Sequence, residues 1–143
     1  MIKNDMAYQK SLQKLETDKE YIEKEYQRLS DLGLEGTQLE MAIQPLISFH
    51  EQLQEEVAYY ERVKKGEFNP IHSLSDLGKN LIAYRIYKGM TQAELATRLN
   101  VSESQVSRDE RHEYYGATTD KLERVMKAME MTAVIHIELS LIS

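Results

Sequence analysis

The chain of 143 residues contains no cysteine and no tryptophan, and it has only two prolines and six glycines. Without cysteine there is no disulfide framework and no thiolate chemistry. No apolar run approaches the roughly 20 residues that a membrane-spanning helix needs. The first ten residues, MIKNDMAYQK, also lack the apolar stretch of a signal peptide. We therefore expect a cytoplasmic protein with no membrane partner.

Signatures of catalysis and of cofactor binding are missing as well. The four histidines, His50, His72, His112 and His136, are scattered, and none has metal-ligand spacing with carboxylates. The sequence has no glycine-rich phosphate loop and no Ser/His/Asp set that its spacing supports. We expect neither an enzyme nor a cofactor.

The two halves of the chain differ in net charge. Residues 1–70 hold nine Lys/Arg and fourteen Asp/Glu, a net charge of −5, whereas residues 71–143 hold nine and ten, a net charge of −1. The C-terminal half is thus close to neutral, and nucleic-acid affinity depends on which charges face the phosphates.

The N-terminal half is predicted to be a helical hairpin. Apolar residues recur at steps of three, four or seven over residues 5–31, and a second such stripe runs to about residue 65. Two glycines break the chain between Ser30 and Gly36, and Pro45 predicts that the second helix begins close to it. Residues 1–66 would form this arm and residues 67–73 a linker. Its stripes favour either packing on the rest of the chain or dimerisation and partner binding.

Residues 91–111, TQAELATRLNVSESQVSRDER, predict two short helices joined by a tight turn. Thr91 with Glu94 and Ser102 with Gln105 each fit a capping box. Asn100 sits at the turn, where a left-handed conformation is needed. This order is typical of a helix-turn-helix, whose second helix can enter a DNA major groove.

The segment resembles the Xre family, the Cro/lambda-repressor type of helix-turn-helix. The resemblance runs from about Leu77 to Met131 and includes LGKNLIAYRIYKGMTQAELATRLNVS, SQVSRDER and TTDKLERVMKAMEM. It implies a DNA-binding domain over residues 74–131 with four to five helices. It also implies a structural ion pair between Arg85, late in the first helix, and Glu110, at the end of the recognition helix.

The expected DNA-binding residues lie at the start of the first motif helix and along the recognition helix. Arg108 is the strongest candidate, because arginine can bind guanine O6 and N7 with two hydrogen bonds. Gln92 is expected to grip a phosphate and to brace the recognition helix. The full set is Gln92, Glu103, Ser104, Gln105, Ser107, Arg108 and Arg111.

Two positions depart from the family pattern. Asp109 stands where the family usually has an apolar residue, and His112 where it usually has glycine. Asp109 is expected to cap the helix or to bridge to Arg108, Arg111 or Arg85. The tyrosines at 114 and 115 would then pack in the loop before the last helix.

The tail, residues 132–143, alternates apolar and polar residues as a half-buried strand does. No other segment reads as a strand. The tail would therefore pair with the same strand of a second chain or pack as irregular chain.

The sequence thus predicts a mostly α fold: an antiparallel helical hairpin, a lambda-repressor-like domain and a short C-terminal β-strand. The expected function is a sequence-specific transcription regulator that binds double-stranded DNA as a homodimer on a palindromic operator. One alternative is the antitoxin of a toxin–antitoxin pair, with a toxin protein as partner. Another is an interaction adaptor whose helix-turn-helix does not bind DNA.

Overall fold

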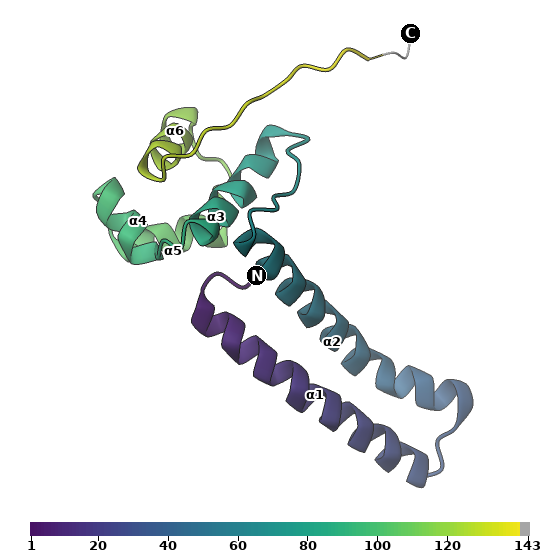
Figure 1. Ribbon diagram of the computed structural model, residues 1–143. Helices are drawn as coiled ribbons and strands as arrows, with labels where there is room; N and C mark the ends of the chain where they lie inside the picture. Colours follow the sequence, from purple (N-terminus) through teal and green to yellow (C-terminus); the bar gives the residue numbers. More distant parts are fainter. Residues whose placement is uncertain (141–143) are drawn as a thin grey trace. The chain divides into compact units, whose positions relative to one another are not determined.

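The computed structural model describes residues 1–140 and divides into two compact units, Met1–Phe68 and a second unit that begins at Asn69. The described residues form six α-helices and one short 3-10 helix, which turns and loops connect (Figure 1). The prediction of a mostly helical chain is confirmed. None of the described helices combines the length and the apolar character that crossing a membrane requires.

The first unit consists of α1 (Asp5–Asp31) and α2 (Gly36–Lys64), which lie side by side and antiparallel (Figure 1). The Asn4 side chain caps α1 by accepting from the Ala7 amide at 2.7 Å. Near the open end of the pair, the Tyr8 and Tyr60 rings stack with their centroids 5.0 Å apart. The core is thin, because α1 contains no buried residue and α2 carries the buried side chains.

The expected start of the second helix near Pro45 is wrong, since α2 begins at Gly36 and continues through the proline. Proline removes one backbone donor, which leaves the carbonyl of Met41 without its usual helical partner. Both Met41 and Pro45 are exposed, so this carbonyl can be solvated by water. The helix therefore tolerates the proline at this position.

The second unit contains η1 (Leu74–Asp76), α3 (Leu77–Tyr87), α4 (Gln92–Leu99), α5 (Glu103–Arg111) and α6 (Thr119–Ala128). Ser73 and Asp76 form a capping box at the start of η1. α4 packs on α5 and α6, and α3 contacts both. The apolar residues that these helices bury include Leu81, Ile82, Leu95, Ala96, Val106, Val125 and Met129.

The predicted C-terminal strand does not form among residues 132–140, which contain no regular secondary structure. A strand needs a neighbour for its backbone donors and acceptors, and no other extended segment of the described chain pairs with it. Ile135, Ile137 and Leu139 are 69%, 92% and 87% exposed. Leu141, the last apolar residue of the alternation, lies outside the described residues.

Candidate nucleic-acid interface

The start of α4 and the turn between α4 and α5 are both fixed by local interactions that the sequence encodes. Thr91 Oγ1 accepts from the Glu94 amide at 3.0 Å, and the Glu94 carboxylate accepts from the Thr91 amide at 3.0 Å. Asn100 follows α4 with φ of 56°, a left-handed conformation that asparagine adopts more easily than most residues. Ser102 Oγ then accepts from the Gln105 amide at 3.1 Å and starts α5. Residues 91–105 therefore determine where α4 begins, how it ends and where α5 begins.

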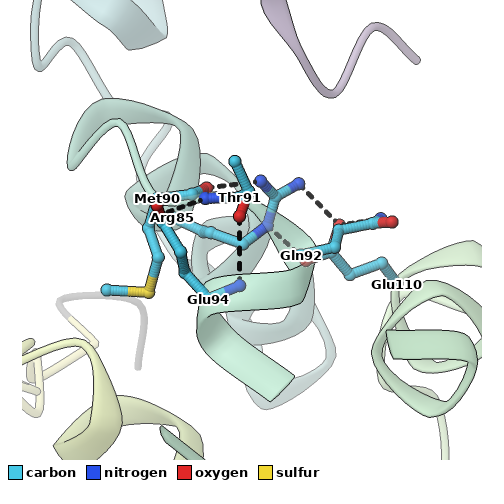
Figure 2. Close-up of polar contacts among 6 residues, drawn as sticks. All are labelled: Arg85, Met90, Thr91, Gln92, Glu94 and Glu110. Atoms are coloured by element: carbon cyan, nitrogen blue, oxygen red, sulfur yellow. Dashed lines mark hydrogen bonds and ion pairs between the residues drawn. The ribbon is translucent and has the colours of Figure 1, made fainter. Parts of the chain in front are cut away.

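Arg85, Glu110 and Gln92 form a hydrogen-bonded cluster that ties α3, α4 and α5 together (Figure 2). Glu110 accepts from Arg85 Nε at 2.6 Å, from Arg85 Nη2 at 2.8 Å and from Gln92 Nε2 at 2.9 Å. Arg85 Nη1 also donates to the Met90 carbonyl at 2.8 Å. The Arg85 and Glu110 side chains are 2% and 0% exposed. This bidentate pair is buried in the position that the family resemblance implies, and it orients α5 against α3.

An open groove of about 440 Å³ runs along the outer face of α5 and the start of α4. Arg108 and Arg111 supply its positive charge, and among residues 1–140 neither of these two side chains has a hydrogen bond or ion pair. Glu103 is the single carboxylate of the groove, at the first position of α5. The lining residues are Gln92, Glu103, Ser104, Ser107, Arg108 and Arg111. Six of the seven expected DNA-binding residues are thus brought together on one face.

Gln105 is the candidate that the structure leaves out of the groove. Its side chain is half-buried and donates from Nε2 to Asp109 Oδ1 at 3.0 Å. The expected second capping box is therefore incomplete, because Ser102 caps the helix while Gln105 does not return the bond. Asp109 lies one helical turn further along α5. Its charged carboxylate is a stronger acceptor for the Gln105 side-chain amide than the water that would solvate this amide in the groove.

Asp109 also corrects an expectation, because its ionic partner is not an arginine. Asp109 Oδ2 lies 2.8 Å from Lys121 Nζ, in the first turn of α6. Asp109, at a position where the Xre family usually has an apolar residue, thus links α5 to α6. Lys121 was not among the candidates, since its contact with residue 109 depends on the path of the loop between them.

The loop that follows α5 is held in an unusual backbone conformation. Glu113 and Tyr114 both have positive φ, 54° and 57°, which costs roughly 1–3 kcal/mol for each non-glycine residue. Tyr114 is buried, as expected, and this burial raises the pKa of its hydroxyl well above the ordinary value, with Glu110 and Asp109 adding to the shift. Tyr115 was expected to pack beside it but is 89% exposed. Only one of the two tyrosines fits into the core because the left-handed residues turn the chain outward.

A close backbone approach fixes this loop against α3. A Cβ built on Gly78 would lie 1.9 Å from the Glu113 carbonyl oxygen. Glycine is therefore required at position 78, since any side chain would displace either α3 or the loop. The end of α5 is thus positioned in two ways. The loop that follows α5 packs closely on Gly78 of α3, and the buried Arg85–Glu110 pair joins α5 itself to α3.

These helices and their groove define a helix-turn-helix DNA-binding domain of the kind that transcription regulators use. The comparison with known families agrees: the family described as Sigma-70, region 4 matches residues 71–112, a segment that runs from before η1 to the end of α5. Comparisons with curated proteins and with solved structures give no match. Among the described residues, no cluster of three or more His, Asp or Glu side chains is arranged to hold a metal ion.

Proposed function

We propose that the protein is an Xre-type transcription regulator that reads a specific DNA sequence through α5. The observation that carries this proposal is the groove, in which two unpaired arginines lie on a helix braced by a buried ion pair. The matched segment ends at His112, whereas α6 packs on α3 and α4 in the same unit. This closing helix corresponds to TTDKLERVMKAMEM, the last part of the resemblance to the Xre family.

Arg108 is the proposed base-reading residue. It lies in the middle of α5 and is exposed in the groove, so its guanidinium can reach a guanine in the major groove. Ser104 and Ser107 line the same groove and can donate to base edges or phosphates. Glu103 can accept from a cytosine amino group at the start of the helix. Arg111 is proposed to contact the phosphate backbone.

Gln92 has two proposed roles, because it lies between the groove and the cluster around Glu110. It is the first residue of α4, where helix N-terminal amides favour a phosphate. Its side-chain amide already donates to Glu110. A phosphate bound at this end of α4 would thus lie next to the residue that braces α5.

The proposed assembly is a homodimer whose two recognition helices bind half-sites about 34 Å apart on a palindromic operator. Two-fold symmetry of the protein would then match that of the site. The exposed apolar side chains of Val134, Ile135, Ile137 and Leu139 offer a surface for the contact between protomers. Sedimentation of a variant lacking residues 133–143 tests this part of the proposal, and an unchanged dimer would show that the contact lies elsewhere.

The test of DNA reading is fluorescence-anisotropy binding of the full chain to the duplex upstream of its own gene, beside a scrambled duplex. We expect Arg108→Ala to weaken binding to the specific duplex by about 5–150-fold, the equivalent of 1–3 kcal/mol, and to change binding to the scrambled duplex little. Arg124→Ala is the matched control, because Arg124 is exposed on α6 and does not line the groove. Equal losses for both variants, or equal affinity for both duplexes, would contradict the proposal.

An antitoxin that represses its own operon is the second candidate function. The acidic first unit favours it, because residues 1–70 carry a net charge of −5 that DNA binding does not use. Both functions are non-enzymatic. A stable protein complex without DNA binding would instead support an adaptor.

A further inference from the structure

His112 directly follows α5 and lies on the same side of this helix as Arg108. Its backbone amide donates to the Arg108 carbonyl at 3.2 Å, so the helical turn continues to residue 112. Residues four apart stand one above the other on a helix, and positions 104, 108 and 112 therefore form one row. The His112 side chain is exposed and lines a cleft that Arg108 also lines. His112 thus lies next to the groove proposed to read DNA.

The cleft has a volume of about 1070 Å³ and is formed by η1, the start of α3, the loop after α5 and the start of α6. Its charged lining residues are three carboxylates and three cations: Asp76, Asp109, Glu113, Lys79, Arg108 and Lys121. Its two tyrosines, Tyr114 and Tyr115, are neutral at the pH values at which histidine titrates. The formal charges of the other residues cancel, so the charge on His112 decides whether the cleft is neutral or positive.

Each carboxylate of the cleft already has donors of its own. Asp109 and Glu113 are paired with the two lysines of the cleft, at nitrogen–oxygen distances of 2.8 and 4.0 Å. Asp76 accepts from two backbone amides of the segment before η1, at 3.0 and 3.2 Å. The His112 ring has no hydrogen bond or ion pair with any of residues 1–140. A charged ring at this position therefore finds no carboxylate partner in the free protein.

We propose that His112 is a further DNA-contacting residue, whose protonated ring binds a backbone phosphate beside the bases that Arg108 reads. The inference rests on the function proposed above and adds to it a charge that depends on pH. Four residues of helix span about 6 Å, and the major groove is about 12 Å wide. A side chain one turn beyond a base-reading residue can therefore reach the phosphates at the edge of the groove. Histidine is the side chain that ordinarily gains or loses its charge between pH 5 and 8.

DNA binding should then be coupled to proton uptake. A phosphate stabilises the charged ring, so the complex holds a proton that the free protein has partly released. The affinity for DNA should therefore rise as the pH falls. We expect binding to the specific duplex to be about twofold to fivefold tighter per protomer at about pH 5.5 than at about pH 8. The logarithmic salt slope should also be steeper by about 0.9 per protomer at the lower pH, because one more phosphate is neutralised.

The test measures fluorescence anisotropy of the specific and the scrambled duplex with the full chain at both pH values. His112→Gln keeps a polar side chain but removes the titrating group, so we expect it to abolish the pH dependence. His112→Lys carries a permanent charge and should bind tightly at both pH values. His72→Gln is the matched control, because His72 is exposed in the same unit and lines neither the cleft nor the α5 groove. Circular dichroism at both pH values checks that each variant is folded.

A phosphate contact carries no base information, so at the lower pH His112→Gln should weaken binding to both duplexes by the same factor, in contrast to Arg108→Ala. Three results would overturn the inference: equal wild-type affinity at both pH values, an unchanged pH dependence in His112→Gln, or a loss confined to the specific duplex. The last result would make His112 a base-reading residue. If the wild type still prefers the specific duplex while His112→Gln has no effect, this inference alone fails. If the wild type prefers neither duplex, the proposed DNA-reading function fails with it.

Discussion

Breaking the buried pair between Arg85 and Glu110 should strongly destabilise the second unit. Arg85→Met removes two hydrogen bonds to Glu110 and one to the Met90 carbonyl. It leaves a carboxylate with 0% exposure, whose remaining donor is the neutral amide of Gln92. Removing one partner of a buried ion pair costs about 3–5 kcal/mol. A unit of about 75 residues has a total stability of roughly 4–11 kcal/mol, so this loss takes a large fraction of it.

The double variant Arg85→Met with Glu110→Met separates the cost of an orphaned charge from the value of the pair. Replacement of both partners by apolar residues of similar volume is often neutral or stabilising. We therefore expect the double variant to lose about 2 kcal/mol or less, although the two single variants should lose about 6–10 kcal/mol in sum. The difference measures the coupling between these two side chains.

Amide hydrogen exchange in α5 is the appropriate assay, because the chain has two units that can unfold separately. Protection of the Val106 amide, which donates to the Ser102 carbonyl, reports opening of the second unit alone. A loss below about 1 kcal/mol for Arg85→Met would refute the reasoning, because a buried charge would then have been left unpaired at little cost. So would a double variant whose loss equals the sum of the single ones.

Three further predictions concern the frame around the recognition helix. Gly78→Ala should destabilise the second unit by about 1–3 kcal/mol or more in thermal unfolding, because its Cβ meets the Glu113 carbonyl; an unchanged melting temperature would contradict the close approach. Thr91→Ala removes one half of the capping box on α4 and should cost about 1 kcal/mol in urea unfolding, whereas Thr91→Ser should cost much less. Burial raises the pKa of Tyr114, so the folded state keeps a proton that the unfolded state releases, and stability should fall as the pH rises above about 10. Tyr114→Phe should remove this decline in pH-dependent unfolding, and a decline that persists would assign it to another group.

Local features of the second unit were predictable from the sequence because each depends on a few neighbouring residues. The Thr91 cap, the left-handed Asn100 and the Ser102 cap are short-range arrangements encoded within residues 91–105. Helix periodicity similarly predicted residues 5–31 as α1. The helical period of α5 also made the groove predictable, because residues 103, 104, 107, 108 and 111 lie on one side of a helix.

Two errors in α5 have the same origin, a side chain that has more than one partner available. Gln105 fits a capping box by spacing, but Asp109 competes for its amide. Asp109 is predicted to cap the helix or to bridge to Arg108, Arg111 or Arg85. Its ionic partner is instead Lys121, which is brought close by a loop whose positive φ values no sequence pattern indicates. The error at Pro45 has another origin: a proline predicts a helix start, but the exposure of Pro45 makes the lost hydrogen bond tolerable inside α2.

The small number of cations in the α5 groove has a consequence for how the protein finds its site. Arg108 and Arg111 are the cations among its described lining residues, and of these two Arg111 alone is assigned to the phosphates, so we expect about one counterion to be released per protomer and a logarithmic salt slope of about −1. Such weak electrostatic retention would shorten each encounter of the proposed regulator with non-cognate DNA. The target search would then proceed mainly by repeated dissociation and diffusion through solution, with little sliding along the duplex.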